Sequence, residues 1–265
     1  MGPQSTRETV RQCAQAAEAA GFDDLWVPDH IAIPPDDAEG SGGRYLDPLT
    51  SLAYLAASTE RIGLGTGILN LPYRPPLPTA KALATVQELS NGRLRLGIGL
   101  GWMDAEFRAL GVDRRRRGRI TDSTLAFFAD CFTRDEVISN DQPFLFLPRP
   151  PRPPVYVGGA APHALERVVR YGDGWMPMEG NAEKLRGEIS QLRELATTAG
   201  RESPEVILMT GVRLEDPGKA RAYVEGLADA GVTQLALGVK YEDADGFKRS
   251  IDAMVTALMD TIRAL

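Results

Sequence analysis

Short apolar runs alternate along this chain with longer segments whose apolar positions recur every three or four residues. The segment at 5–20 has apolar and alanine positions at helical spacing, and residues 22–28 then form an apolar run typical of a buried strand. Comparable runs predict six more strands, near residues 62, 94, 155, 174, 206 and 233. Helices are predicted at about 47–58, 75–89, from 105, from 120, 182–199, 217–230 and 244–265. Strand and helix therefore alternate along the chain.

Regular alternation predicts an α/β fold of parallel strands joined by helical crossovers. Two large architectures satisfy it, a closed (β/α)8 barrel and an open doubly wound sheet. Candidate ligand residues follow several different strands, at Asp29–His30, Gly67–Ile68, 100–102 and Gly158–Gly159. A barrel gathers all such strand ends on one face, whereas a doubly wound sheet gathers only those beside its switch point. We therefore predict a TIM barrel.

A single domain is predicted over residues 1–265, because a chain of this length can form one α/β barrel. One strand is missing from the pattern. Seven strands are predicted where a complete barrel has eight, and residues 1–5 look like the loop that would follow a first strand. Either the barrel is open at one position or the sequence as given starts late.

Charge and composition narrow the classes of function. The net charge is −6, which argues against nucleic-acid binding because that needs a concentrated basic surface. No apolar run is long enough to cross a bilayer and the N-terminus lacks a signal-peptide pattern, so we expect a cytoplasmic protein that does not bind membranes. Two cysteines and two histidines predict neither a disulfide framework nor a metal site.

Arg114 to Arg117, followed by Arg119, form a local basic cluster within this acidic chain. Such a run is either a solvated loop or helix start, or a site for the anionic tail of a ligand. Both interpretations stay open at the level of sequence.

The chain from Pro153 to Leu165 combines a strand, a glycine pair and a helix start. A β-branched and aromatic run ends at Gly158–Gly159, Ala160 follows, and Pro162 is placed to begin a helix. Glycines let backbone N–H groups approach a ligand and a helix N-terminus favours an anion, so the turn suits a phosphate. A tight turn without a ligand explains the same residues.

Several motifs together resemble one known family. They are GFDDLWVPDH at 21–30, RIGLGTGI at 61–68, AKALAT at 80–85, SNGRL at 90–94, GLGW at 99–102, YVGG at 156–159 and GDGW at 172–175. In this order, over residues 6–178, the chain is similar to the bacterial luciferase-like monooxygenase superfamily. Within that superfamily it most resembles the branch of F420-dependent oxidoreductases.

The resemblance implies a (β/α)8 barrel that binds FMN or the deazaflavin F420 at the C-terminal ends of its strands. It implies a non-proline cis peptide bond between Gly67 and Ile68 that presses on the central ring of the cofactor. It also implies a phosphate-binding turn at Gly158, Gly159 and Ala160. Without the resemblance, Gly67 would be an ordinary packing glycine.

Asp29 and His30 match the family's pair beside the polar edge of the cofactor ring. A histidine there exchanges a proton near neutral pH, and Asp29 would orient it or hydrogen-bond the ring. The alternative is a histidine held by a helix cap or a backbone carbonyl. His163 is expected to lie at the surface or behind the site.

Gly99, Gly101 and Trp102 complete the residues expected at the cofactor. In several deazaflavin enzymes of the superfamily a glutamate follows the glycine pair, and here Trp102 stands in its place. An acid is therefore not expected at this position. Trp102 is interpreted either as an aromatic wall of the site or as a structural tryptophan.

The leading hypothesis is an F420-dependent oxidoreductase that transfers a hydride between the deazaflavin and a small organic substrate. An FMN-dependent monooxygenase supplied by a partner reductase is the alternative within enzymes. A non-catalytic flavin-binding protein is the third hypothesis, because an open barrel leaves strand edges that a partner could cover. The resemblance also implies a homodimer.

Overall fold

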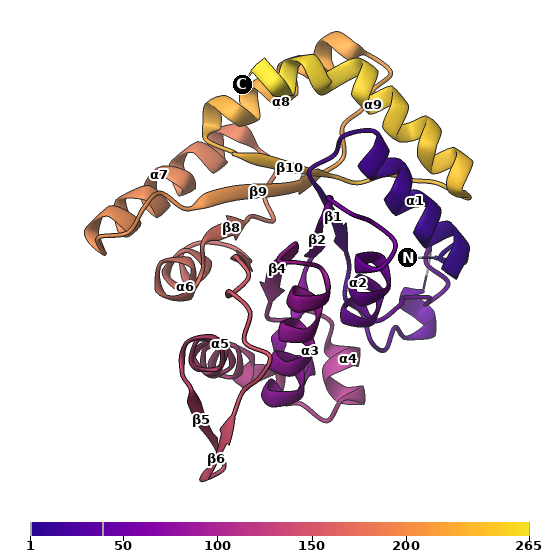
Figure 1. Cartoon of the computed structure of the whole chain (residues 1–265). Coiled ribbons are helices and arrows are strands. Elements are labelled where there is room, and N and C mark those ends of the chain that lie inside the picture. The colour runs from indigo at the N-terminus through magenta and orange to yellow at the C-terminus, as the bar shows by residue number, and fades with distance from the viewer. Residues whose placement is uncertain (1, 39, 265) are drawn as a thin grey trace. The chain divides into compact units, whose positions relative to one another are not determined.

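The computed structural model describes residues 2–38 and 40–264 and shows parallel strands connected by helices (Figure 1). Seven strands follow one hydrogen-bonded path in chain order, and a short strand, β3 (Leu69–Asn70), pairs with β4 beside the path. The strands of the path are β1 (Asp24–Val27), β2 (Gly63–Thr66), β4 (Leu94–Gly99), β7 (Val155–Gly158), β8 (Gly174–Met176), β9 (Glu205–Thr210) and β10 (Gln234–Leu237). Each coincides with a predicted strand, so the predicted α/β alternation is confirmed.

The connecting segments are helices, as predicted. In the described residues they are α1 (Arg7–Ala19), α2 (Pro48–Ala56), α3 (Pro76–Leu89), α4 (Asp104–Ala109), α5 (Arg117–Thr133), α6 (His163–Tyr171), α7 (Ala182–Thr198), α8 (Pro217–Ala230) and α9 (Ala244–Ala264). Three short 3-10 turns supplement them, at Pro35–Asp37, Leu71–Tyr73 and Arg114–Arg116. No helix within residues 2–38 and 40–264 is long and apolar enough to cross a membrane.

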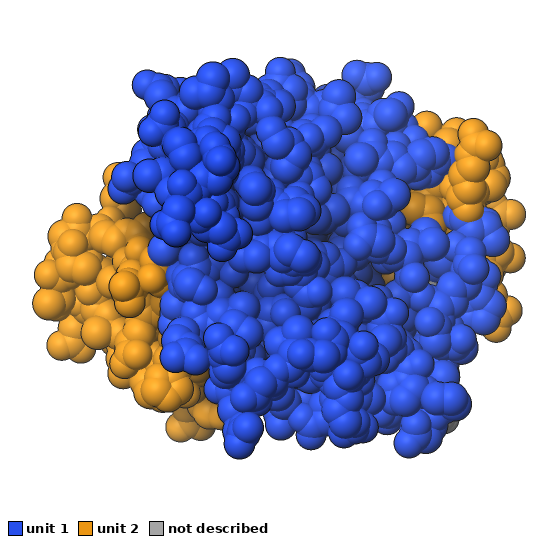
Figure 2. Space-filling view, turned by 90° about the horizontal axis from the view of Figure 1, so that it is seen from below, with its two compact units in different colours: residues 1–6, 26–155 blue, residues 7–25, 156–265 orange. Residues whose placement is uncertain are grey.

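The chain forms two compact units, which are coloured separately in Figure 2. Unit 1 contains residues 1–6 and 26–155, and unit 2 contains residues 7–25 and 156–265. The boundaries fall within β1 and β7, so these two strands contribute residues to both units.

The core of unit 1 forms around β2 and β4, which pair in parallel with Leu64 opposite Leu94. All four residues of β2 are buried, and α2 packs both on β2 and on α3. α2 begins where the sequence predicts. There the carboxylate of Asp47 accepts a hydrogen bond from the N–H of Thr50, and Pro48 occupies the first turn.

In unit 2, β8, β9 and β10 pair in parallel, with Trp175 of β8 opposite Val206 of β9. α8 and α9 pack together through a buried apolar cluster. α8 ends at Gly231, whose φ of 103° is rare for any residue with a Cβ. Nε2 of Gln234 donates to the carboxylate of Asp24 at 2.7 Å, which connects the first residue of β10 to the first residue of β1.

An antiparallel hairpin, β5 (Glu136–Ser139) and β6 (Gln142–Leu145), is an element that the sequence pattern does not predict. Its apolar residues Ile138 and Leu145 are both exposed. Apolar residues therefore stand at exposed positions, and the alternation of apolar and polar residues that predicts a strand is lost. Asn140 and Asp141 both have positive φ, and this two-residue turn was the available signal for a hairpin.

Residues 2–6 form a turn, in which the N–H of Gly2 donates to the carbonyl of Arg44 at 3.0 Å. Among the described residues 2–5 there is no strand, in agreement with the loop expected at 1–5.

Gly65 provides a test of the packing of β2. A Cβ at this position would lie 2.3 Å from the ring of Trp26, so Gly65→Ala forces the indole to move. We expect the free energy of unfolding to fall by about 1–3 kcal/mol, as measured by urea denaturation. Gly226→Ala is the control, because nothing lies within 4 Å of its added Cβ in α8, and it should gain about 0.5–1 kcal/mol. A Gly65→Ala protein as stable as the parent would contradict the close packing of the Trp26 ring on Gly65.

Candidate functional site

The strand ends of unit 1 carry most of the residues that the sequence singles out. Asp29 and His30 follow β1, Gly67 and Ile68 follow β2, Gly99 ends β4, and Gly101 and Trp102 come just after it. The N–H of Gly67 donates to the carbonyl of Val27 at 2.7 Å, which joins the ends of β1 and β2. The Gly67–Ile68 peptide bond is cis, as the resemblance implies.

Two of the predicted cofactor glycines make room for side chains of the protein itself. A Cβ at Gly99 would meet Cδ1 of Ile68 at 2.2 Å, so the Ile68 side chain lies directly over this residue of β4. Gly101 has a φ of 74°, and a Cβ there would lie 2.8 Å from the ring of Tyr73. Both glycines therefore have a packing role, and their contact with a cofactor stays a prediction.

His30 is held by a carboxylate that sequence reasoning missed. Oε2 of Glu106 lies 3.0 Å from Nδ1 of His30, and Oε1 accepts hydrogen bonds from the N–H groups of Ile31 at 2.6 Å and Ala32 at 3.1 Å. The Glu106 side chain is completely buried, whereas that of His30 is 17% exposed. An ionised carboxylate only accepts, so with Glu106 ionised this contact requires the proton of the neutral ring on Nδ1. Nε2 has no partner among the described residues and can exchange a proton.

The carboxylate of Asp29 is engaged elsewhere. It accepts hydrogen bonds from both terminal nitrogens of Arg74, at 2.8 and 2.9 Å, and from the N–H of Asn70 at 2.8 Å. Burial raises the pKa of Asp29, and the charge of Arg74 opposes that rise. The prediction that Asp29 orients the imidazole is therefore corrected, because Glu106 does so. A hydrogen bond from Asp29 to a cofactor stays a prediction.

Aromatic rings surround the imidazole of His30. The ring of Tyr45 lies 4.7 Å from it, centroid to centroid, and the ring of Trp102 lies 6.3 Å away with its plane nearly perpendicular. Trp102 is 65% exposed and contributes little to the core.

The hydroxyl of Tyr73 is buried without a hydrogen-bond partner among the described residues. Burial and the charge of Glu106 raise the pKa of Tyr73, which keeps it protonated.

The arginine cluster forms the start of α5. Arg114–Arg116 make a 3-10 turn that leads into the helix. Arg114 pairs with Asp104 at 3.1 Å and Arg115 with Asp113 at 3.2 Å. These pairs favour the interpretation as a solvated helix start.

The glycine turn of unit 2 follows β7. Gly159 has a φ of 129°, its N–H donates to the carbonyl of Met176, and its carbonyl accepts from Nε1 of the buried Trp175 at 2.8 Å. The N–H groups of Ala160 and Ala161 have no partner among the described residues. They precede α6, which begins one residue later than predicted, with Pro162 as its N-cap. Two unpaired donors beside a helix N-terminus suit an anion.

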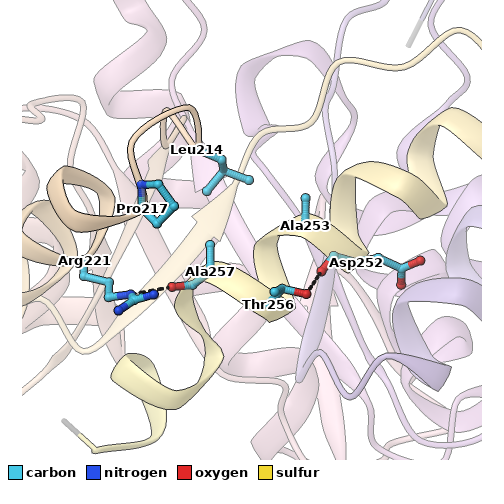
Figure 3. Close-up of a pocket in the computed structure, with 7 residues that line it drawn as sticks. All are labelled: Leu214, Pro217, Arg221, Asp252, Ala253, Thr256 and Ala257. Carbon is cyan, nitrogen blue, oxygen red and sulfur yellow. Dashed lines mark hydrogen bonds between the residues drawn. The ribbon is translucent and has the colours of Figure 1, made fainter.

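Unit 2 also has a surface hollow of about 400 Å³, between the segment after β9 and the helix α9. It is lined by Leu214, Pro217, Arg221, Asp252, Ala253, Thr256 and Ala257 (Figure 3). Nε of Arg221 donates to the carbonyl of Ala257 across it. The described residues contain no group of histidine, cysteine and carboxylate side chains that could hold a metal ion.

Two residues that contact the predicted pair Asp29 and His30 escaped sequence reasoning, Glu106 and Arg74. The available signal for Glu106 was an acidic residue within a short helix directly after a glycine-rich strand end, a place where burial requires a partner. His163 lies on the surface, with its side chain 84% exposed, as expected.

Comparison with known proteins places this geometry in context. The model of a family described as luciferase-like monooxygenase matches residues 1–252. An F420-dependent hydroxymycolic acid dehydrogenase of Mycobacterium tuberculosis is 31% identical over 230 residues, which cover 79% of this chain and 60% of that protein. An F420-dependent glucose-6-phosphate dehydrogenase of Beutenbergia cavernae is 31% identical over 259 residues, covering 91% of this chain and 74% of that protein.

The fold of this chain is also similar to that of solved structures. The crystal structure of monooxygenase RslO1 from Streptomyces bottropensis superposes with a TM-score of 0.85 at 21% identity, covering 98% of this chain and 96% of that one. The predicted (β/α)8-barrel fold class is thereby confirmed.

The Glu106 contact makes a prediction about the proton on His30. Glu106→Gln retains an oxygen for the N–H groups of Ile31 and Ala32 but places an amide NH2 against Nδ1. Because that group donates, Nδ1 must accept, and the neutral ring should carry its proton on Nε2 instead. Two-bond ¹H–¹⁵N correlation spectra at alkaline pH distinguish the two tautomers.

The chain has only two histidines, so His163→Asn assigns their signals. Glu166→Gln is the matched control, because Glu166 lies 3.7 Å from Nδ1 of His163 at the surface. It should leave the His30 signals unchanged. A His30 tautomer that is the same in the parent protein and in the Glu106→Gln variant contradicts the prediction.

Proposed function

This chain belongs to the luciferase-like monooxygenase family, and from that membership we propose that it is an F420-dependent oxidoreductase. It transfers a hydride between F420 and a small organic substrate. The observation that carries the proposal is the His30–Glu106 pair, which leaves Nε2 of a partly exposed histidine unpaired at the end of β1. Two relatives named F420-dependent dehydrogenases, each 31% identical, support the choice of cofactor.

In unit 1, the unpaired Nε2 of His30 beside the exposed Trp102 fits the polar edge of a flat ring. In unit 2, taken by itself, the unpaired N–H groups of Ala160 and Ala161 fit a phosphate. The residues proposed to hold the ring are Gly67, Ile68, Gly99, Gly101 and Trp102, and those proposed to hold the phosphate are Gly158, Gly159 and Ala160. When bound, the deazaflavin supplies a carbon that accepts or donates a hydride.

His30 and Glu106 perform the proton chemistry in this proposal. Nε2 takes the hydroxyl proton of a substrate that is oxidised, or returns it to a substrate that is reduced. Glu106 holds the ring in one orientation and stabilises the imidazolium that forms when Nε2 takes a proton. Of the two roles predicted for Asp29, orienting His30 and hydrogen-bonding the cofactor ring, the proposal keeps only the second.

An FMN-dependent monooxygenase is the second candidate, because the matching family model is described as luciferase-like monooxygenase. A non-catalytic flavin-binding protein remains the third. The proposal further includes one catalytic domain over residues 1–265, a cytoplasmic location and a homodimer.

The choice of cofactor is tested by titrating the purified protein with F420 and with FMN and following the fluorescence of each. We expect the protein to quench the fluorescence of both cofactors, with a dissociation constant for F420 at least about tenfold below that for FMN. This ratio corresponds to a difference of about 1.4 kcal/mol in binding free energy. Binding of FMN alone eliminates the deazaflavin proposal. Binding of F420 without turnover of any substrate favours the non-catalytic protein.

The role of His30 is tested by His30→Ala, which removes the proton acceptor, while the N–H groups of Ile31 and Ala32 still donate to the buried carboxylate of Glu106. We expect kcat to fall by about 10²- to 10⁴-fold while F420 binding, read from fluorescence, is retained. His163→Ala is the control, because that side chain is exposed, and it should leave kcat unchanged. Unchanged turnover in His30→Ala removes this residue from the mechanism.

A further inference from the structure

We propose that the exposed face of α5 in unit 1 is an interface between two copies of this chain, with the two helices antiparallel about a two-fold axis. This inference rests on the homodimer of the proposed function, adds the contact surface to it and does not depend on the cofactor. Two features of unit 1 carry it, the order of charges along α5 and the exposed face of the hairpin β5–β6.

One side of α5 is buried and the other is exposed. The buried side packs on α3 and on the turn Leu71–Tyr73. Residues three and four positions apart lie on the same side of a helix. On the exposed side such a row begins in the turn before α5 and ends at its last residue. Its members are Arg116, Arg119, Ser123, Ala126, Asp130 and Thr133.

The row is basic at its start and acidic near its end. Arg116 and Arg119 make no ion pair with any described residue. The side chain of Asp130 is 44% exposed, and its Oδ1 accepts from Nε of Arg134 at 2.7 Å, which leaves Oδ2 for a second donor.

Within one chain this order of charges is unfavourable. The start of a helix carries partial positive charge and its end partial negative charge, so a helix favours acids at its start and bases at its end. In α5 both ends carry the opposite arrangement. A second α5 that runs antiparallel would place its acidic end against the basic start of the first, and both helix dipoles would then be favourably paired.

The spacing of the row fits this arrangement about an axis between positions 124 and 125. Arg119 lies as far before that point as Asp130 lies after it, so Arg119 of each copy would face Asp130 of the other. Ser123 and Ala126 are related in the same way and would lie at the crossing. Their small side chains allow the helix axes to approach to about 8 Å, the close end of the usual range.

The hairpin begins two residues after the end of α5 (Figure 1). Its register pairs Glu136 with Leu145 and Ile138 with Pro143, and residues paired in this way share a face of the hairpin. All four are exposed, Ile138 by 64% and Leu145 by 69%. An exposed apolar face of this kind marks an interaction surface.

Charge identifies the partner of this face as a second copy. Glu136 lies on the face and Asp141 in the turn, and neither makes an ion pair with a described residue. The whole chain carries a net charge of −6, so two copies repel each other unless a basic segment meets these acids. The arginines at the start of α5 are such a segment. Antiparallel pairing brings them to the hairpin end of the other copy, and the contact is made twice.

A charge exchange tests the interface by sedimentation equilibrium of the purified chain, which we expect to be dimeric at micromolar concentration. Arg119→Glu should raise the dimer dissociation constant by about tenfold, because two attractive contacts become repulsive. Asp130→Arg should act likewise. The two substitutions together exchange the charges and should restore the parent value to within about threefold. Lys248→Glu, on the exposed surface of α9, is the control for the change in net charge.

Steric substitutions test the same surface without a change of sign. Ala126→Trp at the crossing should raise the dissociation constant by at least about tenfold, because it separates the helices. Ala126 is exposed, so the circular dichroism spectrum and the melting temperature of the monomer should stay those of the parent. Ile138→Asp should also weaken the dimer. Ala199→Trp, at an exposed alanine after α7, should leave it unchanged.

The interface is overturned by a parent protein that is monomeric throughout, or by a dimer that Arg119→Glu and Ala126→Trp leave intact. It is also overturned if the double exchange fails to restore the dimer, or if Lys248→Glu weakens it equally. The F420 fluorescence titration is independent of these results. Loss of F420 quenching in the parent overturns the proposed function, whereas a monomeric Arg119→Glu variant that still quenches F420 supports both proposals.

Discussion

A buried carboxylate, that of Glu106, is the constraint on which the geometry around His30 depends. An ionised group removed from water is costly unless hydrogen bonds compensate for the lost hydration. Three donors converge on Glu106, the N–H groups of Ile31 and Ala32 and the imidazole of His30. The segment after β1 must keep these donors in place. The orientation of the imidazole is therefore set by the fold before any substrate binds.

A second network supports the first at the end of β1. Arg74 binds Asp29 with both terminal nitrogens and also pairs with Asp47 at 2.8 Å. Asp47 at the same time caps α2 through the N–H of Thr50, so the end of β1, the segment after β3 and the start of α2 are connected. Although burial raises the pKa of Asp47, the hydrogen bonds from Thr50 and Arg74 outweigh it and the net pKa is lowered. A charged Asp47 thus accompanies the intact network.

The sequence by itself determined the α/β alternation, the positions of the seven strands and the start of α2, because these depend on apolar spacing and capping residues close in the chain. It also carried the family motifs and the place of the cis bond at Gly67–Ile68. Only the tertiary structure decided which side chains meet. Glu106 reaches His30 across 76 positions and Arg74 reaches Asp29 across 45. Such partners depend on which strand ends lie side by side, and no local pattern records that. The hairpin β5–β6 escaped for a related reason, since its exposed apolar face lacks the alternation from which strands are recognised.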